Sequence, residues 1–218
     1  MTRGKRMLVQ VAVTLTACLG VCATAQAGGV VGVPVIIDSF GNPNLAAGPF
    51  TRSVIPLPAA GTSIGTPEGT FSQSNAVATM KMSGAGNAIS GTTLEYVPTS
   101  GAPVDLTGGG TDAQVFIDFA LIDQVPAPDD LSVPGVTTFI TATDANGNIA
   151  TSPADAVGNF FAFNAAFPFT GFQTPTGFDF TKVTQLDISF VYPSSNTGGG
   201  SLEVQVNKLW ATPESGRP

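Results

Sequence analysis

The sequence predicts an all-β protein, built as a two-sheet antiparallel β-sandwich of the jelly-roll type with about 8–10 strands. Three observations lead to this fold class. First, 26 Gly and 17 Pro among 218 residues interrupt the chain too often for long helices. Second, several short segments alternate apolar and polar residues with the period of a strand that has one buried face. Third, 43% of the residues are hydrophobic, which is enough for a packed core.

The first half of the chain contains strands bounded by turn residues. Residues 35–37 are β-branched and are followed by the turn cluster 41–44. Residues 51–57 form a second candidate, and Pro56 and Pro58 at its end are typical of an edge strand. Residues 75–82 and 89–97 are weaker candidates on either side of a Gly-rich turn at 84–87. We expect four short strands here.

The middle of the chain predicts a stronger strand and a hairpin. In residues 114–122 the apolar side chains Val115, Ile117, Phe119 and Leu121 share one face. Residues 136–143 alternate in the same way and lead into a turn that contains Asn146-Gly147, after which residues 149–151 return. An Asn-Gly pair between two alternating runs is a strong signal for a hairpin.

The last two strands have the clearest alternation. Residues 183–191 place Leu186, Ile188 and Phe190 on one face, with Asp187 and Ser189 on the other. A polar, Gly-rich loop is expected at 194–201, and a final strand begins at 202. After residue 207 the alternation slips, because Leu209 falls off the apolar face, which predicts a bulge or the end of the strand.

Eight of the fifteen Phe residues lie between residues 160 and 180. Pro and Gly are interleaved with them, so a loop-rich segment is expected there and not a single strand. Phe has no polar group suited to a wet surface, so we expect most of these rings to cap the core. Any that stay exposed would form an apolar patch for a partner.

Residues 1–27 have the three parts of a secretory signal peptide. Arg3, Lys5 and Arg6 precede an apolar run over 7–21, and the small residues around Ala27 place the cleavage before Gly28. The expected location is extracellular or periplasmic, with one domain over 28–212 and a short tail over 213–218. The alternative is a lipoprotein acylated at Cys18, which ends a lipobox-like Leu-Thr-Ala-Cys sequence.

Removal of this leader sharpens what the composition excludes. The net charge changes from −7 to −10, because five Lys and Arg remain against fifteen Asp and Glu. Both cysteines, Cys18 and Cys22, leave with the leader, and the chain has no histidine. These losses exclude His-based triads, thiol catalysis and His or Cys zinc sites. The acidity argues against a nucleic-acid partner, and no stable membrane span is expected after cleavage.

Three stretches of the chain resemble exported bacterial jelly-roll proteins that usually end in a PEP-CTERM sorting tail. They are residues 96–119, with the sequence VDLTGGGTDA inside them, residues 178–186 (FDFTKVTQL) and residues 202–214, which include LEVQVNKL and end in ATPE. The resemblance implies a fold similar to that of carbohydrate-binding modules. This chain departs from the family at its end, because no apolar helix and no arginine cluster follow Pro213-Glu214-Ser215. The resemblance therefore implies free secretion.

Oxygen ligands and aromatic rings supply the candidate binding sites. Structural calcium is the one cofactor considered, held by Asp38, Glu203 and Asn207 if the two ends of the sandwich lie close together. Jelly-roll binding modules often carry such calcium, as the resemblance implies. The candidate ligand-binding residues are aromatic: Tyr192, Trp210, Phe167, Phe169 and Phe172.

The leading hypothesis is a secreted, non-catalytic module for surface or matrix interactions, with polysaccharide or another envelope component as its partner. A second hypothesis is a structural subunit that assembles through strand edges and the Phe-rich loops. A third is a glycoside hydrolase that uses two carboxylates. The carboxylates available for it on or beside strands are Asp118, Asp123, Asp187 and Glu203. An enzyme is not expected, since nothing in the sequence surrounds a carboxylate with the apolar pocket that would raise its pKa.

Overall fold

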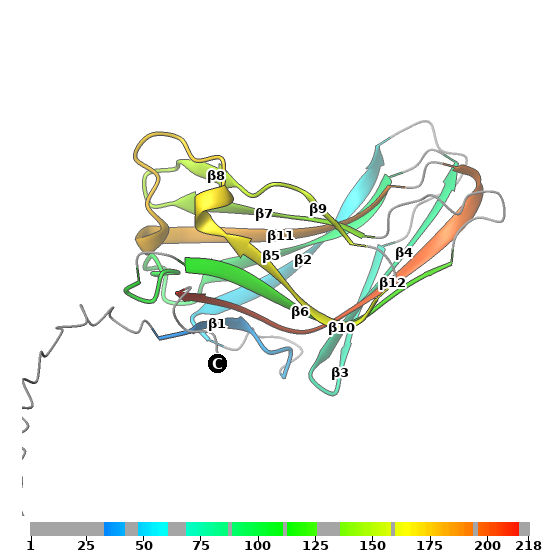
Figure 1. The fold of residues 1–218 in the computed structure, drawn as a ribbon, viewed down its shortest axis with the longest axis horizontal. Coiled ribbons are helices and arrows are strands. Elements are labelled where there is room, and N and C mark those ends of the chain that lie inside the picture. Colours follow the sequence, from blue (N-terminus) through cyan, green and yellow to red (C-terminus); the bar gives the residue numbers. More distant parts are fainter. Residues whose placement is uncertain are drawn as a thin grey trace, which may run out of the picture.

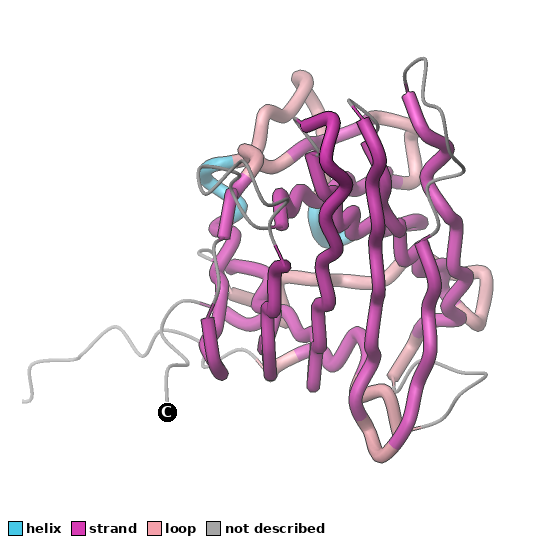
Figure 2. Tube along the Cα trace, turned by 90° about the vertical axis from the view of Figure 1, so that its right-hand side faces the viewer, coloured by secondary structure: helices cyan, strands magenta, loops and turns pink. Residues whose placement is uncertain are grey.

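The chain folds as two six-stranded sheets that face each other (Figure 1). This computed structural model describes residues 33–41, 48–60, 69–86, 89–110, 113–125, 136–157, 160–193 and 196–213. All strand pairings in these ranges are antiparallel. Figure 2 shows how strands dominate the fold, with helix confined to short turns. The expected all-β sandwich is confirmed.

The β12 sheet has the strand order β10-β6-β12-β4-β3, and β1 also pairs with β12. The β11 sheet has the order β2-β5-β11-β7-β8, and β9 also pairs with β7. Two 3-10 turns, η1 (Phe169–Gly171) and η2 (Phe180–Lys182), lie between β10 and β11. The strands are β1 (Val35–Asp38), β2 (Phe50–Ala60), β3 (Gly69–Ser74), β4 (Val77–Gly86), β5 (Ile89–Pro98), β6 (Ala113–Val125), β7 (Val136–Asp144), β8 (Ile149–Thr151), β9 (Asp155–Val157), β10 (Phe160–Pro168), β11 (Val183–Pro193) and β12 (Asn196–Pro213).

The connections have the jelly-roll form. From β4 to β7 each strand crosses to the opposite sheet, and β10, β11 and β12 do the same after the β7–β8 hairpin. The result is a pair of four-stranded layers, β4-β12-β6-β10 and β5-β11-β7-β8, in which neighbours come from distant parts of the sequence. The strands β1, β2, β3 and β9 are added to these layers. They bring the described strands to twelve, more than the 8–10 expected.

The apolar residues of the alternating segments are buried between the two sheets. In β11, Leu186, Ile188 and Phe190 are fully buried, as their spacing predicts. Phe190 meets Phe119 of β6 edge to face across the sandwich, with ring centroids 6.1 Å apart. The core is therefore built from the inner faces of both sheets.

Two other predictions about strands are also confirmed. The β7–β8 hairpin forms around Gly147, whose φ of +79° is a conformation that glycine adopts without strain. The strand with Pro56 and Pro58, β2, lies at the edge of its sheet, where the missing N–H groups cost no pairing.

Two segments expected to be loops are strands. Residues 160–168 form β10, which pairs with β6 along its whole length, and only the second half of the Phe-rich segment is irregular. The Gly-rich stretch expected as a loop at 194–201 belongs to β12 from Asn196 onward and pairs there with β4. In both cases a neighbouring strand supplies the hydrogen bonds, and the local sequence does not reveal that neighbour. No helix in the part of the chain that is described has the length and hydropathy needed to cross a membrane.

Candidate functional site

Trp210 is the one candidate ligand-binding aromatic residue that reaches the surface. Its side chain is half-buried on the outer face of β12. Tyr192 is 1% exposed, and Phe167, Phe169 and Phe172 lie between 4% and 9%. The last two pack with Phe180, whose ring stacks on that of Phe169 at a centroid distance of 3.9 Å. These four rings belong to the core, so they are not available to a ligand on the surface.

The outer face around Trp210 is made by β10, β6 and β12, and β1 borders it on the other side, with Ile36 opposite Trp210 (Figure 1). The register places Trp210 opposite Phe116 and Lys208 opposite Asp118. It also places Asp118 opposite Asn164 on β10. Phe116, Asp118, Asn164, Lys208 and Trp210 form what we call the Trp210 face.

An aromatic pair lies at the centre of the Trp210 face. The rings of Phe116 and Trp210 are stacked, with centroids 5.1 Å apart and an angle of 13° between their planes. Phe116 points away from the core cluster, yet it is only 7% exposed, because neighbours such as Trp210 cover it. The ammonium of Lys208 lies over the indole, 5.1 Å from the ring centroid. The exposed ring therefore has an apolar neighbour on one side and a cation above it.

A bulge brings Lys208 and Trp210 to this outer face. The register between β12 and β6 shifts twice: Ala120 of β6 is passed over before Val206, and Asn207 of β12 is passed over before Lys208, so each strand has one residue outside the pairing. Beyond Asn207, Leu209 and Ala211 are fully buried, although their positions differ in parity from those of Val204 and Val206. The slip that the sequence shows after residue 207 is thus confirmed as a bulge. It returns Leu209 to the core and turns its neighbours outward.

Polar side chains line one side of the aromatic pair. The Asn207 amide donates to Asp118 Oδ2 at 3.5 Å. Asn164 is exposed on β10. The backbone positions of Asn164, Asp118 and Lys208 therefore lie one row, two residues or about 7 Å along each strand, from the row of Trp210, and the Lys208 ammonium reaches back over the indole. The sequence pattern points to Trp210 and Asp118 but not to Asn164 and Lys208, because only the pairing of β10, β6 and β12 brings these residues together.

The three residues considered for calcium are not brought together. Asp38 is fully buried, where its carboxylate accepts from the Phe40 N–H at 2.7 Å and pairs with Arg52. Glu203 pairs with Lys81 on β4 at 3.1 Å. Asp38 lies opposite Leu209, so about 20 Å of β12 separates it from Glu203. Asn207 bonds to Asp118 instead. Among the described residues, no group of three or more acidic, His or Cys side chains could hold a metal ion.

The carboxylates considered for hydrolysis are spread over both sheets. Glu203 faces Asp123 across β12 and β6, but hydrogen bonds from Gln205 and Lys81 lower the pKa of Glu203. A general acid needs a raised pKa. Burial does raise the pKa of Asp187, which lies on the outer face of the other sheet opposite Glu95. The Gln185 amide donates to both of these carboxylates, at 3.0 and 3.2 Å.

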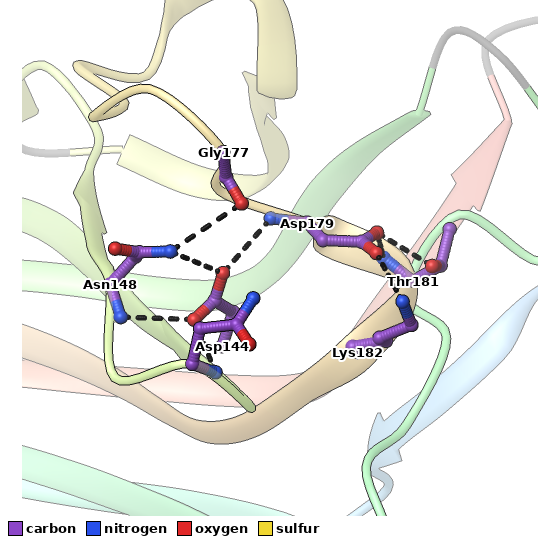
Figure 3. A network of polar contacts seen from close by, with 7 residues as sticks. Asp144, Asn148, Gly177, Asp179, Thr181 and Lys182 are labelled. Carbon is purple, nitrogen blue, oxygen red and sulfur yellow. Dashed lines mark hydrogen bonds and ion pairs between the residues drawn. The ribbon is translucent and has the colours of Figure 1, made fainter.

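A further polar cluster ties the β7–β8 hairpin to the loop before β11 (Figure 3). The Asp144 carboxylate accepts four hydrogen bonds, from Asn146 N, Asn148 N, Asn148 Nδ2 and Asp179 N. These bonds lower the pKa of Asp144 although its burial acts the other way. Asp179 in turn caps η2 and pairs with Lys182 at 3.2 Å. The cluster satisfies its own oxygens, so it fixes the loop and leaves little for a ligand.

The fold of the chain is similar to that of carbohydrate-binding modules. The family 11 module of a cellulosomal cellulase of Clostridium thermocellum is 13% identical, with a TM-score of 0.39 over 82% of this chain and 94% of that module. A family 29 module is 8% identical, with a TM-score of 0.44 over 84% and 91%. A family 28 module, specific for non-crystalline cellulose, is 10% identical, with a TM-score of 0.35 over 72% and 84%. No protein-family model matches the sequence, and no curated protein does. The likeness is distant and concerns the fold alone.

Proposed function

We propose that this protein is a non-catalytic glycan-binding module and that the Trp210 face is its binding surface. The observation that carries the proposal is the half-buried Trp210 ring, which stacks on the buried Phe116 and is flanked in register by Lys208, Asp118 and Asn164. A sugar ring has apolar C–H faces and a rim of hydroxyls. An indole at the surface stacks on the C–H face, and amide, carboxylate and ammonium groups form hydrogen bonds with the hydroxyls.

The position of these groups on regular strands supports the same function. Side chains on the central strands of a sheet are held by packing and pairing, so they are already arranged before a ligand arrives. β6 and β12 are both central in their sheet. A rigid surface of this kind suits a long polymer, which needs no enclosing pocket. Export of the protein stays a prediction, because residues 1–27 lie outside the described part of the chain.

Removal of the exposed indole tests the proposal. We expect Trp210→Ala to weaken binding to a panel of soluble polysaccharides by at least about tenfold, measured by retardation in affinity gels. Ile149→Ala is the matched control, since it truncates an apolar side chain that is 56% exposed on β8 of the other sheet. It should leave binding unchanged.

A second variant guards against a folding defect in Trp210→Ala. Asn164 is exposed and makes no ring contact, so Asn164→Ala should keep the thermal unfolding midpoint and still weaken binding. Retention of wild-type binding by both variants, with a polysaccharide that the wild type binds, would place the binding surface elsewhere and contradict the proposal.

A further inference from the structure

Lys208 is the one basic side chain of the described residues that has no carboxylate partner. Arg52 pairs with Asp38, Lys81 with Glu203 and Lys182 with Asp179. No described carboxylate oxygen lies within ion-pair distance of Lys208 Nζ, although acidic residues outnumber basic ones fifteen to eight in the chain. In a protein with such an excess of acid, a lysine with no carboxylate partner among the described residues requires an explanation.

The ammonium of Lys208 lies over the ring on which a ligand would stack. It lies 5.1 Å from the centroid of the Trp210 ring, and Phe116 already stacks against this ring. A sugar that stacks on the exposed part of the indole therefore competes with the ammonium for it. The cation–π contact is favourable, and displacement of the ammonium loses it.

The loss depends on what the ligand offers to the displaced ammonium. A neutral sugar offers only hydroxyls, which bond to it no better than water does. A carboxylate or sulfate next to the stacked ring offers a charge-assisted hydrogen bond, about twice as strong as a neutral one. From this geometry we infer that the Trp210 face selects an acidic saccharide, whose anionic group bonds to the Lys208 ammonium while its sugar ring stacks on Trp210. This inference rests on the proposed function.

The neighbouring charge limits how acidic the ligand can be. Asp118 lies directly opposite Lys208 on β6, and the Asn207 amide bonds to its carboxylate. Asn164, the next residue across on β10, is neutral. A second anionic group placed toward β6 would be repelled by Asp118. The face therefore fits a sugar with a single charge beside the ring better than a densely sulfated polymer.

Affinity gels that contain polymers of different charge test the inference with the full chain. The acidic polymers are polygalacturonate and alginate, which carry carboxylates, and carrageenan, which carries sulfate. The neutral polymers are hydroxyethylcellulose and dextran. The variants are Lys208→Met, which removes the charge at similar length, and Lys208→Arg, which keeps it. Lys81→Met is the matched control, because it removes the same charge from an exposed lysine elsewhere on the same sheet.

We expect the wild type to bind an acidic polymer more tightly than any neutral one. Lys208→Met should weaken that binding roughly five- to tenfold, whereas Lys208→Arg and Lys81→Met should stay close to the wild type. Binding of neutral polymers should be unchanged or stronger in Lys208→Met. Whichever polymer binds more tightly, the carboxylated or the sulfated one, identifies the anionic group that Lys208 prefers.

Other outcomes separate the inference from the proposed function. Equal weakening of acidic and neutral binding in Lys208→Met would mean that the lysine acts through packing on Trp210, and it would overturn the inference alone. The inference alone would also be overturned if the wild type bound neutral polymers more tightly than acidic ones and Trp210→Ala abolished that binding. Acidic binding that Lys208→Met leaves intact would also overturn it. If no polymer binds the wild type, the proposed function itself fails.

Discussion

Glu95 and Asp187 show how a single residue acquires its chemistry from a neighbour across the sheet. They lie directly opposite each other on β5 and β11, on the outer face of the sheet. Like charges in this position destabilise a sheet, and the one amide of Gln185 that bridges them offsets only part of the cost. Burial raises the pKa of Asp187, and the Gln185 hydrogen bonds counteract this in part. The sequence predicts that Asp187 points outward but does not reveal its partner.

The raised pKa of Asp187 predicts a pH-dependent gain on substitution. Because the folded state holds the proton more tightly than the unfolded state, this group destabilises the fold at neutral pH, and the penalty fades as the pH falls through the raised pKa toward about 4. Asp187→Asn should therefore be more stable than the wild type at pH 7 in urea unfolding, and the difference should vanish near pH 3. Asp155→Asn, at an exposed carboxylate on β9, is the control. A constant difference across this pH range would rule out the titration of Asp187 as the cause.

At the scale of the element, β12 determines which residues form the Trp210 face. Figure 1 shows this strand bent along its length. It pairs with β4 and β1 on one side and with β6 on the other. The extra residue, Asn207, lets the first half of the strand bury Val204 and Val206 and the second half bury Leu209 and Ala211. The bulge thus keeps both halves of a long strand packed in the core and places Lys208 and Trp210 outside.

Deletion of Asn207 should reverse this arrangement. A shift of one residue turns every later side chain of the strand to the opposite face, so Lys208 and Trp210 would point into the core and Leu209 would point to solvent. We expect loss of cooperative thermal unfolding, measured by circular dichroism. Asn207→Gly, which keeps the residue count and suits a bulge, should stay folded. A deletion variant with the wild-type unfolding midpoint would show that β12 slips without cost.

The Phe-rich segment, residues 160–180, shows that local sequence does not always predict secondary structure. Its Pro and Gly residues predict irregular structure, and beyond Phe169 that is what forms. Residues 160–168 nevertheless form β10, because β6 offers an edge along their whole length. Strand formation depends on such a partner more than on propensity. The sequence alone contains no signal for that pairing.

At the scale of the whole molecule, a buried ion pair joins the two sheets. Arg52 of β2 crosses from the β11 sheet to pair with Asp38 of β1 and to donate to Gln73 of β3, both in the β12 sheet. The rings of Phe40 and Phe71 lie 5.2 and 5.1 Å from its guanidinium carbon. The Tyr96 hydroxyl donates to Asp38 at 3.2 Å, and burial, followed by the Asp38 charge, holds the pKa of Tyr96 well above its ordinary value.

Loss of one partner of this pair should destabilise the whole fold. Arg52→Met leaves the Asp38 charge buried without its cation, so we expect the free energy of unfolding in urea to fall by about 3–5 kcal/mol. The double variant Arg52→Met/Asp38→Asn should recover part of this loss, because no buried charge remains. A loss below about 1 kcal/mol in the single variant would contradict the structural role of the pair.

The sequence by itself determines the fold class, most of the strands, most of the faces they bury and the slip in β12, because alternation and turn residues are local properties of the chain. In β6 the buried face changes at Ala120, so Ile122 is buried where Leu121 was expected. It also predicts that chemistry depends on oxygen ligands and a few aromatic rings. Only the tertiary structure decides which of these groups meet. It buries Asp38 against Arg52, sends Tyr192 and the Phe candidates into the core, and assembles Trp210 with Lys208 and Asn164 from three strands. The register between distant strands makes those choices, and register follows from the packing of the complete sandwich.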